Sequence, residues 1–354
     1  MSGALDETVS RIRPPDDEVW RRAARLLDAK TKPPGSLGRL EDLACRLAAI
    51  RGEVPTGAVS PAIVVAAADH GVVVEGVSPY PQEVTGQMLA NFAAGGAAVS
   101  VLARQGGARL VVVDAGVVAP PAADGVRSGV VDGIRGTGNI ALGPAMTRRV
   151  AVGLIEGGIS LAHELVDEAI GIVAVGDMGI GNTTAASALC AALLPADPLR
   201  TCGPGTGLDE AGVAHKVEVV RRALAANGLD GGSVDPMDTL ASVGGLEIAF
   251  LTGVILGASS RRVPVLLDGF VTGAAALVAR AIVPVVAGSL IAATRSPEPG
   301  HVLVLERLGL EPLLDLRLRL GEGSGAALAL PLVRAAVAIV TEMATFEAAG
   351  VSRA

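Results

Sequence analysis

The segment Gly176–Thr184, with the sequence Gly-Asp-Met-Gly-Ile-Gly-Asn-Thr-Thr, has the residue types best suited to bind an anion. It follows an apolar run over 172–175 and precedes an Ala-rich segment that begins at Ala185. This order predicts a buried strand, a glycine-rich turn and the start of a helix. A helix N-terminus exposes unpaired N–H groups and a partial positive charge, so phosphate is a natural ligand there.

Side chains of the same turn add to that chemistry. Asn182 and Thr183 supply further hydrogen-bond donors, the glycines allow close backbone approach, and Asp177 stands at the end of the strand. An ordinary strand-to-helix turn with an Asn or Thr cap would show the same pattern. The turn therefore predicts an anion site, with an ordinary capped turn as the alternative.

A second candidate is Glu322, which lies between glycines in the run Leu320-Gly321-Glu322-Gly323-Ser324 before an apolar helical pattern. A carboxylate among apolar residues has a raised pKa when it loses contact with water, which suits a general base near neutral pH. The neighbouring glycines leave room for a flat substrate. The alternative is a solvated glutamate in a turn.

A second glycine loop, Gly203–Gly207, runs into a predicted helix that contains Lys216. A lysine one or two turns inside such a helix could reach a phosphate as a point charge, although helix lysines are commonly solvated. The chain has no GxxxxGK[ST] motif, which argues against a P-loop kinase. No GxGxxG motif follows a predicted strand, which argues against a dinucleotide-dependent dehydrogenase.

Four apolar runs end at an aspartate, namely Asp69, Asp114, Asp177 and Asp268. Continuous apolar strands that alternate with helical segments predict a parallel sheet covered on both faces. Ligands of such sheets bind beyond the carboxyl ends of the strands, so the four aspartates would line one crevice. Aspartate is also a common helix N-cap, which is the structural alternative for each of them.

These elements predict an α/β fold: a Rossmann-like, mostly parallel sheet with helices on both faces. Residues 1–55 and 330–354 show helical patterns, which predict a small all-helical domain built from both termini. Residues 56–329 would form the large α/β catalytic domain. The longest irregular stretch is 118–148.

Composition narrows the class of protein. The net charge of −7 argues against nucleic-acid binding, because no basic stripe would offset the phosphates. The three cysteines lie far apart without a CxxC, so neither a metal site nor a disulfide framework is expected. The N-terminal residues do not resemble a secretory signal, and the most apolar regions are interrupted short of the roughly 20 residues that a membrane span needs. We expect a cytoplasmic protein that does not enter a membrane.

Five motifs in one order cover nearly the whole chain and together resemble the nicotinate-nucleotide–dimethylbenzimidazole phosphoribosyltransferase family. They are Lys-Pro-Pro-Gly-Ser-Leu-Gly over 32–38, Ala-Asp-His-Gly over 68–71, Ser-Pro-Tyr-Pro-Gln-Glu-Val-Thr over 78–85, Gly-Asp-Met-Gly-Ile-Gly-Asn-Thr-Thr over 176–184 and Leu-Gly-Glu-Gly-Ser-Gly-Ala-Ala-Leu over 320–328. Members of this family make the lower-ligand nucleotide of cobalamin.

The resemblance implies that a nitrogen of 5,6-dimethylbenzimidazole attacks C1′ of nicotinate mononucleotide. Nicotinate leaves and α-ribazole 5′-phosphate forms with inversion at C1′. The family's catalytic glutamate falls on Glu322, which would take the proton from the benzimidazole ring. The positively charged pyridinium is already a good leaving group, so neither a metal nor another cofactor is expected.

The resemblance also assigns the other site residues. Gly179, Gly181, Asn182, Thr183, Lys216 and Ser296 would hold the phosphate and ribose, and Tyr80, Gln87, Met88 and Leu320 would line the benzimidazole pocket. Met178, Gly205 and Asp268 complete the expected substrate-binding set. The family often has Glu where this chain has Asp177, which shortens that side chain by one methylene; we expect Asp177 to act at the ribose or beside the developing positive charge.

Two other classes stay open from the sequence. A nucleotide-binding sensor could use the same scaffold, since a fold alone does not fix a function. A dehydrogenase is disfavoured by the missing fingerprint. The resemblance and exposed apolar helix surface lead us to expect a homodimer with two small-molecule substrates.

Overall fold

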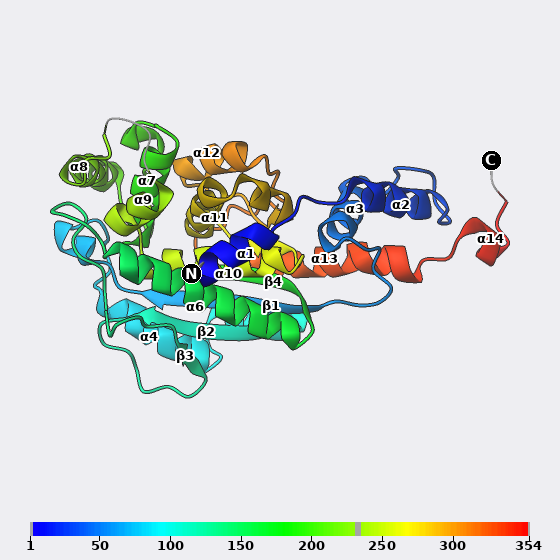
Figure 1. Cartoon of the computed structure of the whole chain (residues 1–354), viewed down its shortest axis with the longest axis horizontal. Coiled ribbons are helices and arrows are strands. Elements are labelled where there is room, and N and C mark those ends of the chain that lie inside the picture. Colours follow the sequence, from blue (N-terminus) through cyan, green and yellow to red (C-terminus); the bar gives the residue numbers. More distant parts are fainter. Residues whose placement is uncertain (1–2, 231–234, 353–354) are drawn as a thin grey trace.

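The computed structural model describes residues 3–230 and 235–352 and is built around one six-stranded parallel sheet (Figure 1). The strands are ordered β3-β2-β1-β4-β5-β6, so the direction of strand addition reverses between β1 and β4. Their bounds are β1 Ser60–Ala68, β2 Arg109–Gly116, β3 Val126–Ser128, β4 Ile170–Met178, β5 Val265–Leu267 and β6 Leu290–Ala292. The predicted α/β fold with helices on both faces is confirmed.

The helices described are α1 Ala4–Arg11, α2 Asp17–Asp28, α3 Arg39–Arg51, α4 Glu83–Ala93, α5 Ala98–Gly106, α6 Arg148–Asp167, α7 Asn182–Leu193, α8 Glu210–Ala226, α9 Pro236–Val243, α10 Leu246–Ser260, α11 Phe270–Ile282, α12 Pro299–Leu308, α13 Ser324–Glu342 and α14 Phe346–Ala349. Three short 3₁₀ helices are η1 Gly71–Glu75, η2 Pro198–Arg200 and η3 Pro284–Ser289.

Alternate residues of the central strand β1 pack into two separate hydrophobic cores. Ala62, Val64 and Ala66 face the core formed with α6, α7, α10 and α11, whereas Ile63 and Val65 face the core formed with α3, α5 and α13. Every apolar residue of β1 is thus buried on one face or the other, as the continuous apolar pattern requires.

Helices α6 and α10 pack against each other through glycines. A Cβ atom at Gly158 would lie 2.0 Å from the carbonyl oxygen of Phe250, and one at Gly253 would lie 2.0 Å from that of Ile155. The missing side chains let the two backbones approach closely. The whole of α10 is buried, so this contact is part of the core beneath the sheet.

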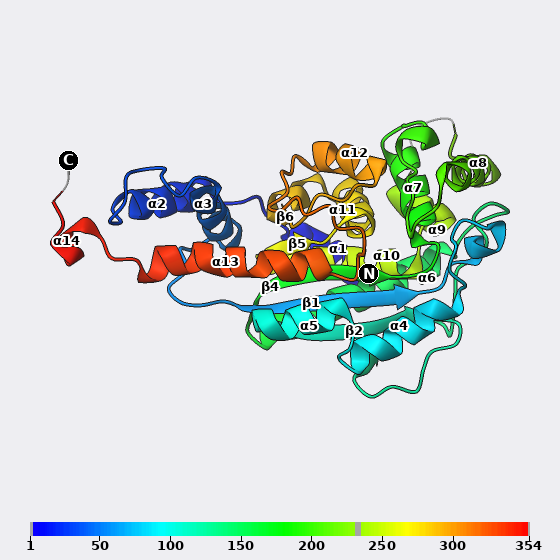
Figure 2. The same ribbon diagram turned by 180° about the vertical axis from the view of Figure 1, so that it is seen from behind.

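Helix α13 runs from beside the sheet to the end of the molecule where α2 and α3 lie, with α14 at the tip (Figure 2). The predicted domain boundary at residue 330 falls inside α13. Helix α1 packs on α6 and α10, away from α2 and α3, although it belongs to the N-terminal segment assigned to the helical domain. Residues 1–2 and 353–354 of that assignment lie outside the described residues, and the division 1–55 and 330–354 against 56–329 stays a prediction.

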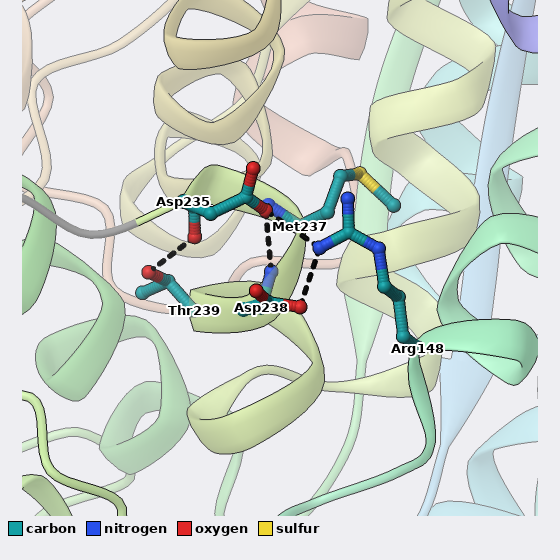
Figure 3. Close-up of polar contacts among 5 residues, drawn as sticks. All are labelled: Arg148, Asp235, Met237, Asp238 and Thr239. Carbon is teal, nitrogen blue, oxygen red and sulfur yellow. Dashed lines mark hydrogen bonds and ion pairs between the residues drawn. The ribbon is translucent and has the colours of Figure 1, made fainter.

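A surface ion-pair network ties the start of α6 to the start of α9 (Figure 3). Arg148 points at the carboxylates of Asp235, 2.8 Å away, and Asp238. Asp235 also caps α9 by accepting from the N–H groups of Met237 and Asp238, and its carbonyl accepts from the Thr239 hydroxyl. This arrangement fixes the entry to α9 against α6.

Two helical stretches, Glu83–Gly106 and Ser324–Glu342, are long and apolar enough by length and composition to cross a bilayer. In this fold the apolar side of Ser324–Glu342 packs in the second core through Ala326, Leu330 and Val333. A buried core helix meets the same criteria, so the finding does not contradict the expectation of a protein that stays out of the membrane.

Candidate active site

The carboxyl ends of β4, β5 and β6 open into a cavity of about 710 Å³, next to the point where the strand order reverses. Parallel α/β sheets bind ligands at this position. Most residues proposed from the sequence line it: Tyr80, Met88, Asp177, Met178, Gly179, Asn182, Thr183, Gly205, Asp268, Ser296, Leu320 and Glu322. The volume is in the range of small-molecule sites.

The glycine-rich turn joins β4 to α7 along one wall of the cavity. Gly181 has a φ of 91° and forms the N-cap of α7, a conformation that favours glycine. The Ile180 N–H donates to the Thr85 hydroxyl at 3.1 Å, and the Asn182 amide donates to Asp177 at 2.8 Å. These bonds hold the start of α7 toward the cavity, where a helix N-terminus favours an anion.

Lys216 is fully buried behind this turn and does not line the cavity. Its Nζ donates to the Thr183 hydroxyl at 2.8 Å and to the Gly203 carbonyl at 3.3 Å. Burial lowers the pKa of Lys216, while the nearby Glu298 carboxylate acts in the opposite direction. The lysine thus links the second glycine loop to the α7 terminus and orients Thr183.

The resemblance implies that Thr183 binds the phosphate of nicotinate mononucleotide. Replacing Lys216 with glutamine is then expected to raise the KM for that nucleotide about 10-fold or more, because the Thr183 hydroxyl loses its bond from a cation. The KM for the second substrate should change little. Steady-state kinetics with each substrate varied in turn checks this. An equal rise in both KM values would contradict the assignment.

Glu322 sits in a left-handed turn against the end of β4. Gly321, Glu322 and Gly323 have φ values of 79°, 64° and 83°, so a non-glycine residue adopts a strained conformation at this point. The Glu322 N–H donates to the Asp177 carbonyl at 3.2 Å. A Cβ at Gly176 would lie 2.5 Å from the Gly323 nitrogen, so that glycine is what allows the turn to approach the strand.

Asp268 fixes the other side of the same turn. Its carboxylate accepts from the N–H groups of Gly323 at 3.1 Å and Ala326 at 2.9 Å, and so caps α13. Burial raises the pKa of Asp268 to about 6. Asp268 therefore positions the Glu322 turn as well as lining the cavity.

Three acid groups of the cavity favour their neutral forms more than carboxylates in water do. Burial, with Asp268 as a second cause, raises the pKa of Glu322 to about 7. Burial and then the like charge of Asp268 raise the pKa of Asp177 well above its usual value. Glu322 is thus poised to exchange a proton near neutral pH, as a general base must.

The opposite wall is formed by the segment after β6. The Gly205 N–H donates to Glu298 at 2.8 Å, which pins the second glycine loop to this wall. The Ser296 N–H donates to Nδ1 of His301 at 2.9 Å, and burial lowers the pKa of His301 to about 4, so this ring is a neutral acceptor. His301 acts on the site by holding the Ser296 loop.

Some proposed residues lie elsewhere. Gln87 faces a neighbouring hollow together with Asp69, and Gly181 and Lys216 stand behind the cavity wall. Asp114 pairs with Arg135 at 2.8 Å and accepts from backbone N–H groups of its own turn. The expectation that all four strand-end aspartates line one crevice is therefore wrong. Asp177 and Asp268 line the cavity from the adjacent strands β4 and β5. Asp69 lines the neighbouring hollow, where it accepts from the Val118 N–H at 2.8 Å, and Asp114 stands farther along the sheet, at the end of β2.

Sequence reasoning missed other residues at the cavity. They include Thr294, Glu298, Arg317, Leu318 and Arg319. The Arg-Leu-Arg-Leu run over 317–320 is charged and adjacent to the proposed base, which is a usable signal. Within the described ranges no group of three His, Cys, Asp or Glu residues is arranged to hold a metal ion.

The sheet topology, a helix N-terminus at the cavity and a buried carboxylate beside it are typical of enzymes that bind small anionic ligands. A family model described as phosphoribosyltransferase matches residues 12–351. The nicotinate-nucleotide–dimethylbenzimidazole phosphoribosyltransferases of Desulforamulus reducens and Desulforudis audaxviator are 49% and 51% identical, covering 99% of this chain and 99% and 98% of their own lengths. The crystal structure of CobT from Thermus thermophilus superposes with a TM-score of 0.89 at 46% identity, covering 95% of this chain and 100% of that one.

The chain belongs to the nicotinate-nucleotide–dimethylbenzimidazole phosphoribosyltransferase family. The resemblance noted from the five motifs is confirmed.

Proposed function

We propose that this protein transfers the ribose phosphate of nicotinate mononucleotide to 5,6-dimethylbenzimidazole. The observation that carries the proposal is Glu322, a buried carboxylate with a pKa of about 7 that lines the same cavity as the α7 N-terminus. One end of the cavity thus suits a phosphate, and another suits a substrate that gives up a proton.

In the proposed reaction one benzimidazole nitrogen forms a bond to C1′ as the bond from C1′ to the pyridinium nitrogen breaks. The breaking bond's electron pair stays on nicotinate, which leaves. The proton on the other benzimidazole nitrogen passes to Glu322. A general base contributes about 10²–10⁴-fold, and juxtaposition of the two substrates adds to that.

The remaining proposed roles follow the cavity walls. The phosphate lies at the start of α7, next to the N–H groups of Gly179 and Thr183 and to the Thr183 hydroxyl that Lys216 orients, with the Gly205 loop opposite. Asp177, held by Asn182, lies at the ribose, where the positive charge at C1′ favours its ionised form. Ser296 completes the donor site.

The acceptor is proposed to lie against the apolar side chains of Tyr80, Met88, Met178 and Leu320, which line the cavity next to Glu322. We also propose that the protein is a homodimer, as the resemblance to the family implies. A cytoplasmic location stays an expectation.

The rate should depend on pH through Glu322. The base must be unprotonated, so kcat/KM is expected to fall about tenfold per pH unit below about 7 and to level off above it. A pH profile over the range from about 5 to about 9 measures this. In a Glu322→Gln variant the residual rate should lack this acid limb; a limb that persists would belong to another group.

The test of the function is a product assay. Protein incubated with nicotinate mononucleotide and 5,6-dimethylbenzimidazole should yield nicotinate and α-ribazole 5′-phosphate in equal amounts by chromatography. Nicotinate alone would mean that water or another base is the acceptor. Nucleotide binding without either product would instead support a sensor.

A further inference from the structure

The cavity has an unusual balance of charge. Four carboxylates line it, from Asp177, Asp268, Glu298 and Glu322, whereas the cationic side chains that line it are Arg317 and Arg319. The proposed donor carries both a phosphate and a carboxylate. An anionic donor therefore needs these two cations, even with some of the cavity acids protonated.

Neither arginine is used by the fold. Within residues 3–230 and 235–352, Arg317 and Arg319 make no side-chain hydrogen bond or ion pair, while Arg39, Arg46 and Arg135 all have partners. Both arginines are exposed at the cavity, in the segment that leads directly into the Glu322 turn. Their guanidinium groups are thus available to a ligand.

The backbone of this segment supports a role at the site. Arg317 has a φ of 55°, and Glu322 in the same wall has a φ of 64°. Residues other than glycine rarely adopt such φ values. Those that do are often found at functional sites, where the surrounding structure holds the backbone in this conformation. Nη1 of Arg319 lies near Gly207, 3.8 Å from where a Cβ would stand, so this side chain spans from the Glu322 segment to the second glycine loop.

The phosphate already has its partners in the proposed reaction, namely the α7 N-terminus and the Lys216–Thr183 pair behind it. The donor's other anionic group is the carboxylate on the pyridine ring. We propose that Arg317 and Arg319 bind this carboxylate and thereby select nicotinate mononucleotide over its amide, nicotinamide mononucleotide. This proposal rests on the proposed function, and it identifies the two residues that would determine the specificity for the donor.

The chemistry of the guanidinium group supports this choice. A guanidinium presents paired N–H donors that match the two oxygens of a carboxylate, and charge-assisted bonds of this kind are stronger than neutral ones. A carboxamide offers one acceptor oxygen and no charge. The carboxylates of the cavity repel a further anion. Nicotinate mononucleotide, with its ring carboxylate, therefore needs the arginines more than nicotinamide mononucleotide does.

Calorimetric titration of nicotinate mononucleotide and of nicotinamide mononucleotide tests the proposal, since the two differ at this group alone. In Arg317→Gln, Arg319→Gln and the double variant, the Kd for the acid should rise, by about 10- to 100-fold in the double variant. The Kd for the amide should stay almost unchanged. Arg307→Gln, an exposed change on α12 that also removes one charge, serves as the control and should alter neither Kd.

A ratio of the two Kd values that is the same in wild type and the double variant would overturn the proposal. If both Kd values rose together, the arginines would bind the phosphate or ribose that the ligands share. The product assay on the wild type separates this result from failure of the proposed function: turnover with an unchanged ratio refutes the arginine role alone, and binding without turnover refutes the transferase.

Discussion

A Glu322→Gln variant is expected to bind nicotinate mononucleotide like the wild type and to lose about 10²–10⁴-fold in kcat. Glutamine keeps the shape of the side chain and the N–H that donates to Asp177, but its amide cannot take a proton from the attacking benzimidazole. Single-turnover rates with saturating donor and acceptor measure the loss directly. Glu306→Gln, an exposed change on α12, is the matched control and should keep full activity.

The same variant has an expected effect on stability that a folding defect would not give. The folded-state pKa of Glu322 is raised to about 7 from 4.5, so the folded protein holds this proton more tightly than the unfolded chain does. The stabilisation that protonated Glu322 gives the folded protein is fully present below about pH 4.5 and is lost as the pH rises through about 7. Glu322→Gln should therefore raise Tm relative to wild type at about pH 8 more than at about pH 5.

Wild-type turnover in a well-folded Glu322→Gln protein would remove Glu322 from the mechanism. A lower Tm of the variant on the alkaline side would show instead that the ionised carboxylate stabilises the turn, contrary to the burial described above. The two measurements together separate the catalytic role of the side chain from its place in the fold.

The sequence predicts the sheet well where strands are long and apolar. The runs that form β1, β2, β4 and β5 are recognisable because strands buried on both faces are continuously apolar. The strand β6, Leu290–Ala292, is apolar and buried, but with three residues it does not stand out from the apolar residues around it. The strand β3 lacks an apolar pattern altogether. β3, Val126–Ser128, is a short edge strand inside the irregular stretch 118–148, and it has one apolar residue, so no pattern sets it apart from a loop.

Site residues can be predicted where they stand in a recognisable sequence motif. They are missed where only the packing of distant segments brings them to the cavity. The Gly179–Thr183 turn and Glu322 stand in glycine-rich runs, which indicate an anion site and a buried carboxylate respectively. Glu298 has no such mark, because its contact with Gly205 joins residues 93 positions apart. The same holds for Lys216, whose burial behind Thr183 depends on how α8 packs and not on its position within that helix.

The close contact of α6 and α10 could not be predicted from the sequence either. A single methyl group added at this contact is expected to destabilise the fold more than the other substitutions proposed for this protein. Gly253→Ala would place a Cβ 2.0 Å from the Ile155 carbonyl oxygen and 2.7 Å from the carbonyl carbon. These are backbone atoms, so relief requires the helices to separate beneath the sheet. Overpacking of this kind costs about 3 kcal/mol or more, which exceeds the gain of roughly 1 kcal/mol in helix propensity.

Gly157→Ala is the matched control, since it stands on α6 beside the same interface. Its Cβ would lie 3.4 Å from the Phe250 ring, an ordinary contact with a side chain that can adjust. This variant should gain helix propensity without a clash and unfold at or above the wild-type Tm. Thermal unfolding of both variants distinguishes the causes. A marked decrease of Tm in Gly253→Ala alone would show that the fold requires the two helix backbones to approach closely at this position. Equal Tm values would mean that α6 and α10 can separate without cost, and that glycine at 253 is not needed for the fold.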